Sequence, residues 1–473
     1  MTVKKGQILE LKIEKLIFGG RGLARVDGFA LFVENVVPGD EVRARVFRKK
    51  KHHAEARVLE LIHPSPFRVA PPCRYSGFCG GCPWQFLDYG KQLAFKREQV
   101  VESLEHIGQL RDILVHPAIP SEREFGYRNK MEFSFSDRRW LFPEELSQPG
   151  VSKDFALGLH VSGCFHKVLD IDTCLIQPPL GNNILGEVRR YTRQSGIPPY
   201  GLRSHKGFWR FLMLRYSPSY DTWMVNIVTS EEQTPWVQPL SRLLCDKYEN
   251  ITSVVNNVNT RRASIAVGER ERVLAGEAVV RDRIGGFEFE ISANSFFQTN
   301  TAGAECLYNV VKAYAGLTGK ESVLDLYSGT GTIPIFLAHG ARDIVGIEIS
   351  ETAVEDAKKN CEKNQVDNCQ FMCMDMRKGL QLIRQRPDVV IIDPPRAGMH
   401  PDVVQAVCTE RPTRIVYISC NPATLARDLA VLKEYYDVAE VQPVDMFPHT
   451  HHIECVARLE SKLRLACVTS LPL

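Results

Sequence analysis

The sequence of 473 residues has no apolar run long enough to cross a membrane and almost no excess of charge. A membrane-spanning helix needs roughly 18–20 consecutive apolar residues, and no segment approaches that length. The 59 Lys and Arg residues nearly balance the 56 Asp and Glu residues, so the net charge is only +3. Any surface that binds nucleic acid must therefore be local. The N-terminal segment has no hydrophobic signal region, and we expect a cytoplasmic protein with no membrane partner.

Three regions with different residue patterns divide the chain. Residues 1–62 consist of short alternating or β-branched segments separated by tight turns, which predicts a small β-barrel of the oligonucleotide-binding type. Residues 63–290 open with a proline-rich linker and then contain mostly strand-like runs, which predicts a central α+β domain. In residues 291–473, apolar strands alternate with helical segments, as in a doubly wound, Rossmann-like α/β domain. We expect a multidomain monomer.

A run of basic residues lies near the end of the first region. Arg43 and Arg45 are followed by the uninterrupted run Arg48-Lys49-Lys50-Lys51-His52-His53. Such a run is equally consistent with a solvated strand or hairpin and with an edge that contacts the phosphates of RNA.

Polar residues follow four successive strands of the expected C-terminal sheet. The first strand ends at Tyr327 and runs into a glycine loop, 328–332, that contains neither GxxxxGK(S/T) nor GxGxxG. The second strand ends at Glu348, an acid placed to hold two ribose hydroxyls. The third leads to Asp375, placed to meet an adenine amine, and the fourth ends in Asp393-Pro394-Pro395-Arg396. Because such strand ends line one ligand-binding edge, the combination resembles the class I S-adenosylmethionine-dependent methyltransferases.

The residue after Asp393-Pro394-Pro395 is informative about the reaction. Amino-methyltransferases that carry this motif usually follow it with an aromatic residue, which stacks on the base. Here Arg396 follows, which argues against methylation of an exocyclic nitrogen and for a different reaction.

A cysteine and a glutamate stand out near the C-terminus. The strand 414–419 delivers Cys420 to the same ligand-binding edge, and we expect the N-terminus of the next helix to favour its thiolate. Glu454 lies in the apolar strand 453–459, where an acid is rarely buried without a function. Three histidines precede this glutamate and are typical either of a metal site or of a turn: His449, His451 and His452.

The cysteine and the glutamate suit the methylation of uracil. Carbon 5 of uracil is a poor nucleophile, but a thiolate that adds to carbon 6 makes an enolate and concentrates charge on carbon 5. That carbon can attack the methyl group of a sulfonium, after which a base must remove the carbon-5 proton so that the thiolate can leave. In this reaction Cys420 supplies the nucleophile, Glu454 supplies the base, and the target uracil is swung out of its stack.

Five short motifs follow one another in the C-terminal region: DLYSGTG, GIEIS, DPPR, ISCNP and HHIECV. The series resembles the RNA uracil-C5-methyltransferase family over essentially the whole chain, and the N-terminal barrel resembles the TRAM domain of that family. The resemblance implies an enzyme with Cys420 as nucleophile and Glu454 as base. It places an aromatic, here Phe296, near the bound base, and a common asparagine is replaced by Thr332. It implies S-adenosylmethionine contacts at five residues: Gln298, Tyr327, Glu348, Asp375 and Asp393.

The 14 cysteines do not have the pattern of a secreted disulfide framework, but three of them are closely clustered. Cys73, Cys79 and Cys82 lie among glycines that can bend around an ion, which indicates a metal or iron–sulfur site with a fourth ligand elsewhere. Cys164 and Cys174 are both candidates for that ligand, and spacing alone also allows a zinc site. The family resemblance implies Cys174 and a [4Fe-4S] cluster.

The sequence does not show which residues recognise the RNA. The barrel and the cysteine cluster together resemble the large-subunit ribosomal RNA enzymes of the family, so we expect 23S rRNA as the target, with transfer RNA as the alternative. A second hypothesis is a protein that only binds structured RNA and carries a silent methyltransferase fold. The presence of both Cys420 and Glu454 favours the enzyme.

Overall fold

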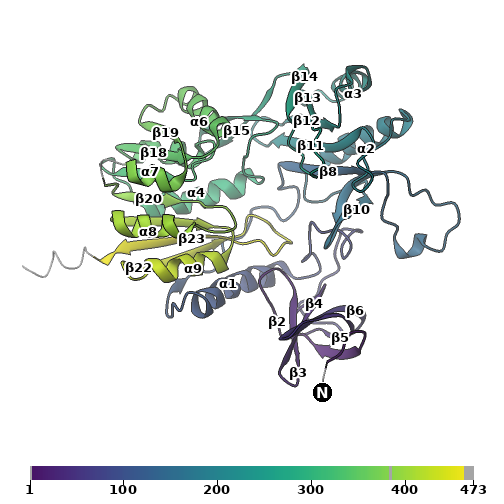
Figure 1. Cartoon of the computed structure of the whole chain (residues 1–473), viewed down its shortest axis with the longest axis horizontal. Coiled ribbons are helices and arrows are strands. Elements are labelled where there is room, and N and C mark those ends of the chain that lie inside the picture. The colour runs from purple at the N-terminus through teal and green to yellow at the C-terminus, as the bar shows by residue number, and fades with distance from the viewer. Residues whose placement is uncertain (1–2, 383–385, 463–473) are drawn as a thin grey trace, which may run out of the picture.

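The structure is a computed structural model that describes residues 3–382 and 386–462. Over these residues the chain forms three large sheets and one two-stranded hairpin, with helices packed mainly on the central and C-terminal sheets (Figure 1). No helix within the described ranges is long and apolar enough to span a membrane.

The N-terminal region is a curved six-stranded sheet with the strand order β1-β5-β6-β4-β3-β2, purple in Figure 1. Alternate side chains of β5, namely Val42, Ala44 and Val46, are fully buried in the core of this barrel. Gly39 in the turn before β5 has a φ of +91°, which a residue with a Cβ rarely adopts. The all-β prediction for this region is confirmed. Its strands are β1 (Ile8–Lys12), β2 (Lys15–Leu16), β3 (Gly22–Val26), β4 (Phe29–Glu34), β5 (Glu41–Lys49) and β6 (His53–His63).

The basic run of the sequence lies at one end of the barrel. Arg48 and Lys49 end β5, and Lys50 and Lys51 form the turn before β6. All four side chains are exposed. Arg48 forms an ion pair of 3.9 Å with Glu55. Because all four side chains are exposed, most of the positive charge of the run still faces solvent.

The central region contains a seven-stranded sheet with the order β10-β9-β8-β11-β12-β13-β14. Its neighbouring strands are antiparallel except for the β12–β13 pair. Helices α2 and α3 contribute Val188 and Leu240 to a core that also contains the buried Trp209. The elements are β8 (Lys130–Ser136), η1 (Pro143–Glu145), β9 (Ala156–Val161), β10 (Cys164–Asp170), α2 (Pro179–Gln194), β11 (Trp209–Ser217), β12 (Thr222–Thr229), α3 (Thr234–Lys247), β13 (Ile251–Val258) and β14 (Arg270–Gly276).

The C-terminal region is built on an eight-stranded sheet with the order β19-β18-β17-β20-β21-β23-β22-β7. The strands from β19 to β21 are parallel, and β23 runs antiparallel to both of its neighbours. Along β17, Val323 and Leu324 belong to two different hydrophobic cores, so both faces of the sheet are covered. This confirms the doubly wound α/β prediction.

The elements of this region follow a two-stranded hairpin. That hairpin pairs β15 (Val279–Ile284) with β16 (Phe287–Ser292). The strands of the sheet are β17 (Ser322–Leu326), β18 (Asp343–Glu348), β19 (Cys369–Cys373), β20 (Val389–Ile392), β21 (Arg414–Ser419), β22 (Tyr436–Val444) and β23 (Glu454–Ser461). The helices are α4 (Thr301–Ala315), α5 (Thr332–Leu337), η2 (Ala338–Gly340), α6 (Glu351–Lys363), α7 (Met376–Leu382), α8 (Pro401–Glu410) and α9 (Pro422–Leu432).

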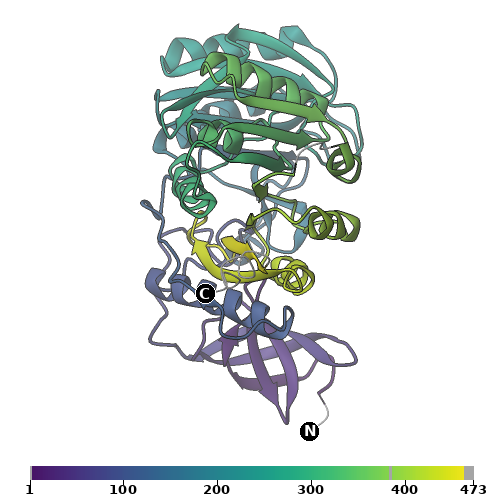
Figure 2. The same cartoon turned by 90° about the vertical axis from the view of Figure 1, so that its left-hand side faces the viewer.

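Two elements from the segment 63–290 pack with the C-terminal region, which differs from the division expected from the sequence. Strand β7 (Leu114–Val115) pairs with β22, and helix α1 (Tyr89–His106) packs against α9. Val100 and Leu104 of α1 share a core with Leu429 of α9. Both views show α1 between the barrel and the C-terminal sheet (Figures 1 and 2). An amphipathic pattern indicates which face of a helix is apolar but not the element that covers it.

Candidate active site

The predicted site residues gather at the carboxyl edge of the C-terminal sheet. Tyr327 follows β17, Glu348 ends β18, and Asp375 lies shortly after β19. Asp393 follows β20 and Cys420 follows β21. Because these strands are parallel neighbours, their ends bring all five side chains to one edge, which is where open α/β sheets bind ligands.

The loop between β17 and α5 has a constrained backbone. Tyr327 has a φ of +68°, and the N–H groups of Tyr327 and Ser328 both donate to the carbonyl of Ile347, at 3.0 and 3.1 Å. Gly331 starts α5 with a φ of +77°, and a Cβ there would lie 2.9 Å from the ring of Phe371. Left-handed backbone at a non-glycine residue is costly and is concentrated at ligand sites. The loop therefore has the features of a ligand-binding turn.

Two acids at this edge are held ready to accept hydrogen bonds. The Glu348 carboxylate accepts the N–H groups of Gly329 at 3.0 Å, Ile349 at 2.8 Å and Ser350 at 2.9 Å. Each carboxylate oxygen has further lone pairs, so this group can still accept hydroxyls from a ligand. The guanidinium of Arg377 binds both oxygens of Asp375 at 2.9 Å and lowers the pKa of that carboxyl to about 2.

The residue Gln298 lies in the loop before α4 and belongs to a small polar group. Its backbone carbonyl accepts the Asn129 side-chain amide at 2.9 Å, and its side chain lies beside the hydroxyl of Tyr308. That buried hydroxyl also lies 3.0 Å from Oγ1 of Thr332 at the start of α5. Tyr308 was not predicted from the sequence, because a tyrosine on the apolar face of a helix is typical of a core residue.

Asp325 is a second residue that sequence reasoning did not assign. It lies in β17, is 1% exposed, and neither of its carboxylate oxygens has a hydrogen-bond partner. Burial and the nearby carboxylates of Asp393 and Glu348 raise its pKa well above the usual range. A signal was present, since an acid in an apolar strand is the pattern that singled out Glu454. Unpartnered buried oxygens beside other acids fit a ligand that carries positive charge and donor groups.

Cys420 and Glu454 lie across from each other on neighbouring strands. Ser419 of β21 pairs with Cys455 of β23, and the two strands are antiparallel. The residue after Ser419, Cys420, therefore lies opposite the residue before Cys455, Glu454. Burial raises the pKa of Glu454 to about 8, and the negative charge of Asp393 adds to this effect. Such a perturbed acid next to a thiol in a ligand-binding edge is typical of a catalytic site.

The expected stabilisation of the Cys420 thiolate is not found. Burial raises the pKa of this thiol to about 11, and the carboxylates of Glu454 and Asp393 contribute to the increase. These effects act against the N-terminus of α9, which was predicted to favour the thiolate. The positive charge of Arg396 acts in the opposite direction and lowers the pKa of both Cys420 and Glu454.

The residue after the cysteine ties two motifs together. Asn421 caps α9 by accepting the N–H of Ala423 at 3.0 Å, as asparagine does at many helix N-termini. Its side-chain amide donates to the carbonyl of Arg396 at 3.1 Å. The loop that carries Asp393 and the loop that carries Cys420 are therefore fixed relative to each other.

The three histidines before Glu454 form a packed turn. Burial lowers the pKa of His449 and His451 to about 4 and that of His452 to about 3, so all three rings are neutral near pH 7. His452 contacts the guanidinium of Arg396 at 3.2 Å. Across the described ranges, no group of three or more His, Cys, Asp or Glu side chains is arranged to hold a metal ion.

The clustered cysteines converge with the fourth cysteine implied by the family resemblance. Cys73, Cys79, Cys82 and Cys174 line one small, mainly apolar cavity. Burial and the neighbouring thiols raise the pKa of Cys79 to about 12, and burial raises that of Cys174 to about 11. Cys164 lies elsewhere, at the start of β10, with its sulfur 3.5 Å from Nδ1 of His166.

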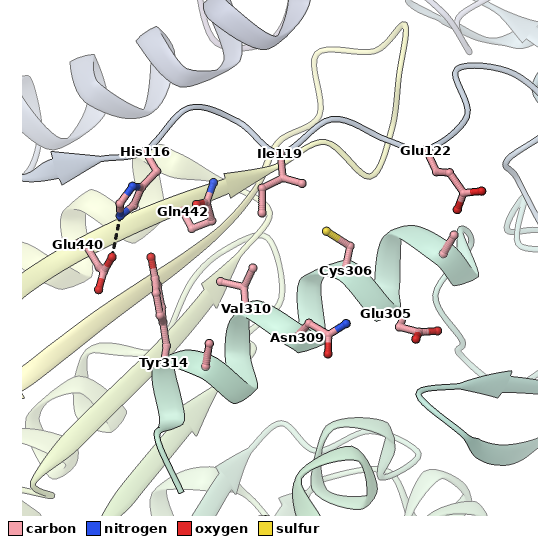
Figure 3. A pocket seen from close by; sticks show the side chains of 12 residues that line it. His116, Ile119, Glu122, Glu305, Cys306, Asn309, Val310, Tyr314, Glu440 and Gln442 are labelled. Carbon is pink, nitrogen blue, oxygen red and sulfur yellow. Dashed lines mark hydrogen bonds and ion pairs between the residues drawn. The ribbon is translucent and has the colours of Figure 1, made fainter.

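A groove of about 740 Å³ lies between α4, β22 and the segment after β7 (Figure 3). His116 and Glu440 form an ion pair of 2.6 Å at one end of it, and Tyr314 lies beside them. None of the predicted site residues lines this groove. The chemistry of the carboxyl edge is therefore separate from it.

Known proteins share the sequence and fold of the region that carries this site. Residues 258–462 match the tRNA (Uracil-5-)-methyltransferase family, and residues 2–59 match the TRAM domain. A protein of Chlorobaculum tepidum, named an uncharacterized RNA methyltransferase, is 41% identical over 97% of this chain and 97% of its own. A protein of the same description from Halalkalibacterium halodurans is 37% identical over 97% of this chain and 98% of its own.

A solved structure is similar over nearly the full length. The tRNA (uracil-54, C5)-methyltransferase of Pyrococcus abyssi, in complex with S-adenosyl-L-homocysteine, is 31% identical and covers 95% of this chain and 100% of its own, with a TM-score of 0.74. The fold class and the resemblance inferred from the motifs are confirmed. The chain therefore belongs to the S-adenosylmethionine-dependent RNA uracil-C5-methyltransferase family.

Proposed function

We propose that this enzyme methylates carbon 5 of a specific uridine in RNA through a covalent adduct with Cys420. The observation that carries the proposal is the pairing of a half-buried thiol, Cys420, with a half-buried acid, Glu454, across two adjacent strands. Both lie at the edge where Glu348, Asp375 and Asp393 present acceptors. A nucleophile, a base and a ligand-binding edge are thus in one place.

Each residue has a defined part in this reaction. The Cys420 thiolate adds to carbon 6, and the electrons of the carbon 5–carbon 6 double bond move into an enolate. When bound, S-adenosylmethionine supplies the methyl group that carbon 5 takes up and is released as S-adenosylhomocysteine. Glu454 then removes the proton from carbon 5, the double bond forms again, and the carbon–sulfur bond breaks to restore the thiolate. Arg396 lowers the pKa of both groups and so favours their reactive, ionised forms.

The acids of the edge suit S-adenosylmethionine. The ligand has a positively charged sulfonium and amino group, which match the buried and unpartnered carboxylate of Asp325. Glu348 is placed for the ribose hydroxyls, and Asp375 for the adenine amine. Gln298, Tyr327 and Asp393 complete the set of proposed contacts. Phe296 is 70% exposed, which leaves its ring free to stack on a flipped uracil.

We further propose that Cys73, Cys79, Cys82 and Cys174 bind a [4Fe-4S] cluster. The four thiols line one small, mainly apolar cavity, and sulfur ligands in such surroundings are typical of iron–sulfur sites. A single zinc ion would need sulfur atoms about 3.8 Å apart, as the tetrahedral Zn–S bonds of about 2.3 Å require. Within the described residues no group of three or more His, Cys, Asp or Glu side chains is arranged to hold a metal ion, so the geometry favours neither zinc nor the cluster. Zinc remains the alternative that metal analysis would distinguish.

For the substrate we propose 23S rRNA, with transfer RNA as the second candidate. The barrel with its exposed basic run and the cysteine-lined cavity support ribosomal RNA. The activity of the Pyrococcus abyssi enzyme on tRNA supports the second candidate. Both predict 5-methyluridine as the product.

The proposal is tested by mapping 5-methyluridine in both RNAs from cells that lack this protein. We expect one site in 23S rRNA to be unmethylated and to be restored by the wild-type protein with labelled S-adenosylmethionine. Loss of a site in transfer RNA instead would favour the second candidate. Full methylation of both RNAs, with no methyl transfer in vitro, would contradict the enzymatic proposal.

A further inference from the structure

The loop that joins β22 to β23 carries the base of the reaction at its end. Val444, the last residue of β22, pairs with Glu454, the first residue of β23. The residues between them, 445–453, close this hairpin. We call Phe447–His452 the histidine turn. Any displacement of this loop is passed directly to Glu454, because Glu454 is the first residue after it.

A buried ion pair holds one end of the loop. Nζ of Lys96 in α1 lies 2.7 Å from Oδ1 of Asp445, and the two side chains are 1% and 0% exposed. The same carboxylate oxygen accepts the N–H of Phe447 at 3.0 Å, and Lys96 donates to the carbonyl of Phe447 at 3.2 Å. The pair therefore fixes both backbone groups of Phe447.

A second set of contacts holds the middle of the histidine turn. Oε1 of Gln92 accepts the N–H of His449 at 2.8 Å, and Nε2 of Gln92 lies 3.2 Å from Nδ1 of the same ring. The N–H of Trp84 donates to the carbonyl of His449 at 2.9 Å. His449 has a φ of +64°, so these bonds hold a conformation that a histidine would rarely adopt alone.

The N-terminal barrel also touches the turn. A Cβ on Gly20, in the turn between β2 and β3, would lie 3.0 Å from Nδ1 of His451. The indole N–H of Trp84 donates to the carbonyl of Gly20 at 3.3 Å. Trp84 lies two positions after Cys82, so it belongs to the cysteine-bearing loop. Together with the contacts of Gly20 and α1, this brings the barrel, that loop and α1 together at the histidine turn.

We propose that Lys96, Asp445 and Gln92 are positioning residues that hold the histidine turn and thereby place Glu454 for removal of the carbon-5 proton. The inference rests on the proposed role of Glu454 as base. Stability alone does not account for the pair, since desolvation often makes a buried ion pair no better than an apolar pair of similar size. The ion pair forms directional bonds to the backbone of Phe447, and Gln92 forms one to the backbone of His449, which apolar side chains could not supply.

The test separates formation of the covalent adduct from its resolution. The variants Asp445→Asn, Lys96→Met and Gln92→Met are mixed with labelled S-adenosylmethionine and total RNA from cells that lack this protein. We expect methylated, covalently bound RNA to form at nearly the wild-type rate and to be released roughly 10 to 100 times more slowly, as a small misplacement of a catalytic group produces. Denaturing gels follow the bound RNA. Glu98→Gln, an exposed charge on α1, is the matched control and is expected to release RNA normally.

Glu454→Gln in the same experiment distinguishes two failures. If Glu454→Gln accumulates the adduct but Asp445→Asn and Gln92→Met release it at the wild-type rate, the positioning proposal is overturned and the base assignment stands. If Glu454→Gln itself releases RNA normally, both are overturned. Equal slowing of formation and release would indicate general destabilisation and would also reject positioning. Should Asp445→Asn or Lys96→Met fail to fold, as judged by S-adenosylmethionine binding, the uncharged Gln92→Met decides the question.

Discussion

The carboxylate of Glu454 faces Cys420 from the neighbouring strand and raises the pKa of its thiol. The group that completes the reaction thus disfavours ionisation of the group that starts it. Cys420 must be ionised when it adds to the ring, whereas Glu454 must be ionised only later, when it removes the proton. The positive charge of Arg396 offsets this effect in part, because it lowers the pKa of both groups.

Replacing Cys420 with alanine is expected to abolish methyl transfer. S-adenosylmethionine binding should be nearly unchanged, because Cys420 is outside the proposed set of S-adenosylmethionine contacts. RNA that contains 5-fluorouridine should trap a covalent adduct with the wild type, since fluorine cannot leave carbon 5 as a proton does. Adduct formation by Cys420→Ala would show that another residue is the nucleophile.

Replacing Glu454 with glutamine should separate addition from release. Addition and methyl transfer are expected to proceed, because neither step uses Glu454 as a base. Turnover should fall by about 10²–10⁴-fold, the usual contribution of a general base. Covalent protein–RNA species should accumulate with ordinary RNA. The control is Glu460→Gln, which lies on the same strand and forms an ion pair with Arg414. Wild-type turnover by Glu454→Gln would show that Glu454 is not the base.

The rate of adduct formation is expected to rise with pH. The pKa of Cys420 is raised to about 11, so near neutral pH the thiol form dominates and the thiolate fraction increases as the pH increases. Well below the pKa, the fraction should grow roughly tenfold per pH unit. Arg396→Gln removes a charge that lowers this pKa and should slow adduct formation at every pH. Trapping with 5-fluorouridine RNA between about pH 6 and 9 measures both effects, and a flat profile would contradict them.

The basic run of the barrel should contribute to RNA affinity. Replacing Lys49, Lys50 and Lys51 with glutamine is expected to weaken binding and to flatten the log–log salt dependence by roughly 0.7–0.9 for each phosphate that the variant no longer binds. Binding titrations at several salt concentrations measure this slope. Replacing Lys358 and Lys359, two exposed lysines on α6, with glutamine is the control for loss of surface charge elsewhere. An unchanged slope would show that the run is only a solvated surface.

Protein purified without oxygen is expected to be brown and to contain the iron of one [4Fe-4S] cluster. Loss of Cys174 should remove the iron, and loss of Cys164 should not, because only Cys174 lines the cavity with the clustered cysteines. S-adenosylmethionine binding should survive loss of iron, since the proposed contacts are all in the C-terminal region. Metal analysis of both alanine variants decides this. One zinc and no iron would keep the four ligands and reject the cluster.

Much of the fold could be predicted because its signals are local. Strands such as 322–326 and 414–419 are short apolar runs, and the helix 89–106 has an amphipathic pattern, so their positions follow from nearby residues. The carboxyl edge followed from the order of those strands. The partner of α1 did not, because Val100 and Leu429 are far apart along the chain and only packing brings them together.

The candidate site was predicted in part for the same reason. Cys420, Glu454 and the acids at the strand ends are unusual residues in apolar surroundings, which a sequence shows directly. The raised pKa of Cys420 could not be predicted, because it depends on burial and on two carboxylates from other strands. The hydroxyl pair of Tyr308 and Thr332 also depends on packing between helices.

The contact between α1 and the last hairpin has a consequence for how the protein is made. Lys96 and Asp445 are 349 residues apart in the chain. At a synthesis rate of about 5–20 residues per second, α1 leaves the ribosome roughly 17–70 seconds before its partner does. During most of that interval α9 has not been made, and its Leu429 shares a core with Val100 and Leu104 of α1. We therefore expect the barrel and the central sheet to fold first and α1 to dock last, so that a nascent chain stalled before residue 445 would need a chaperone to remain soluble.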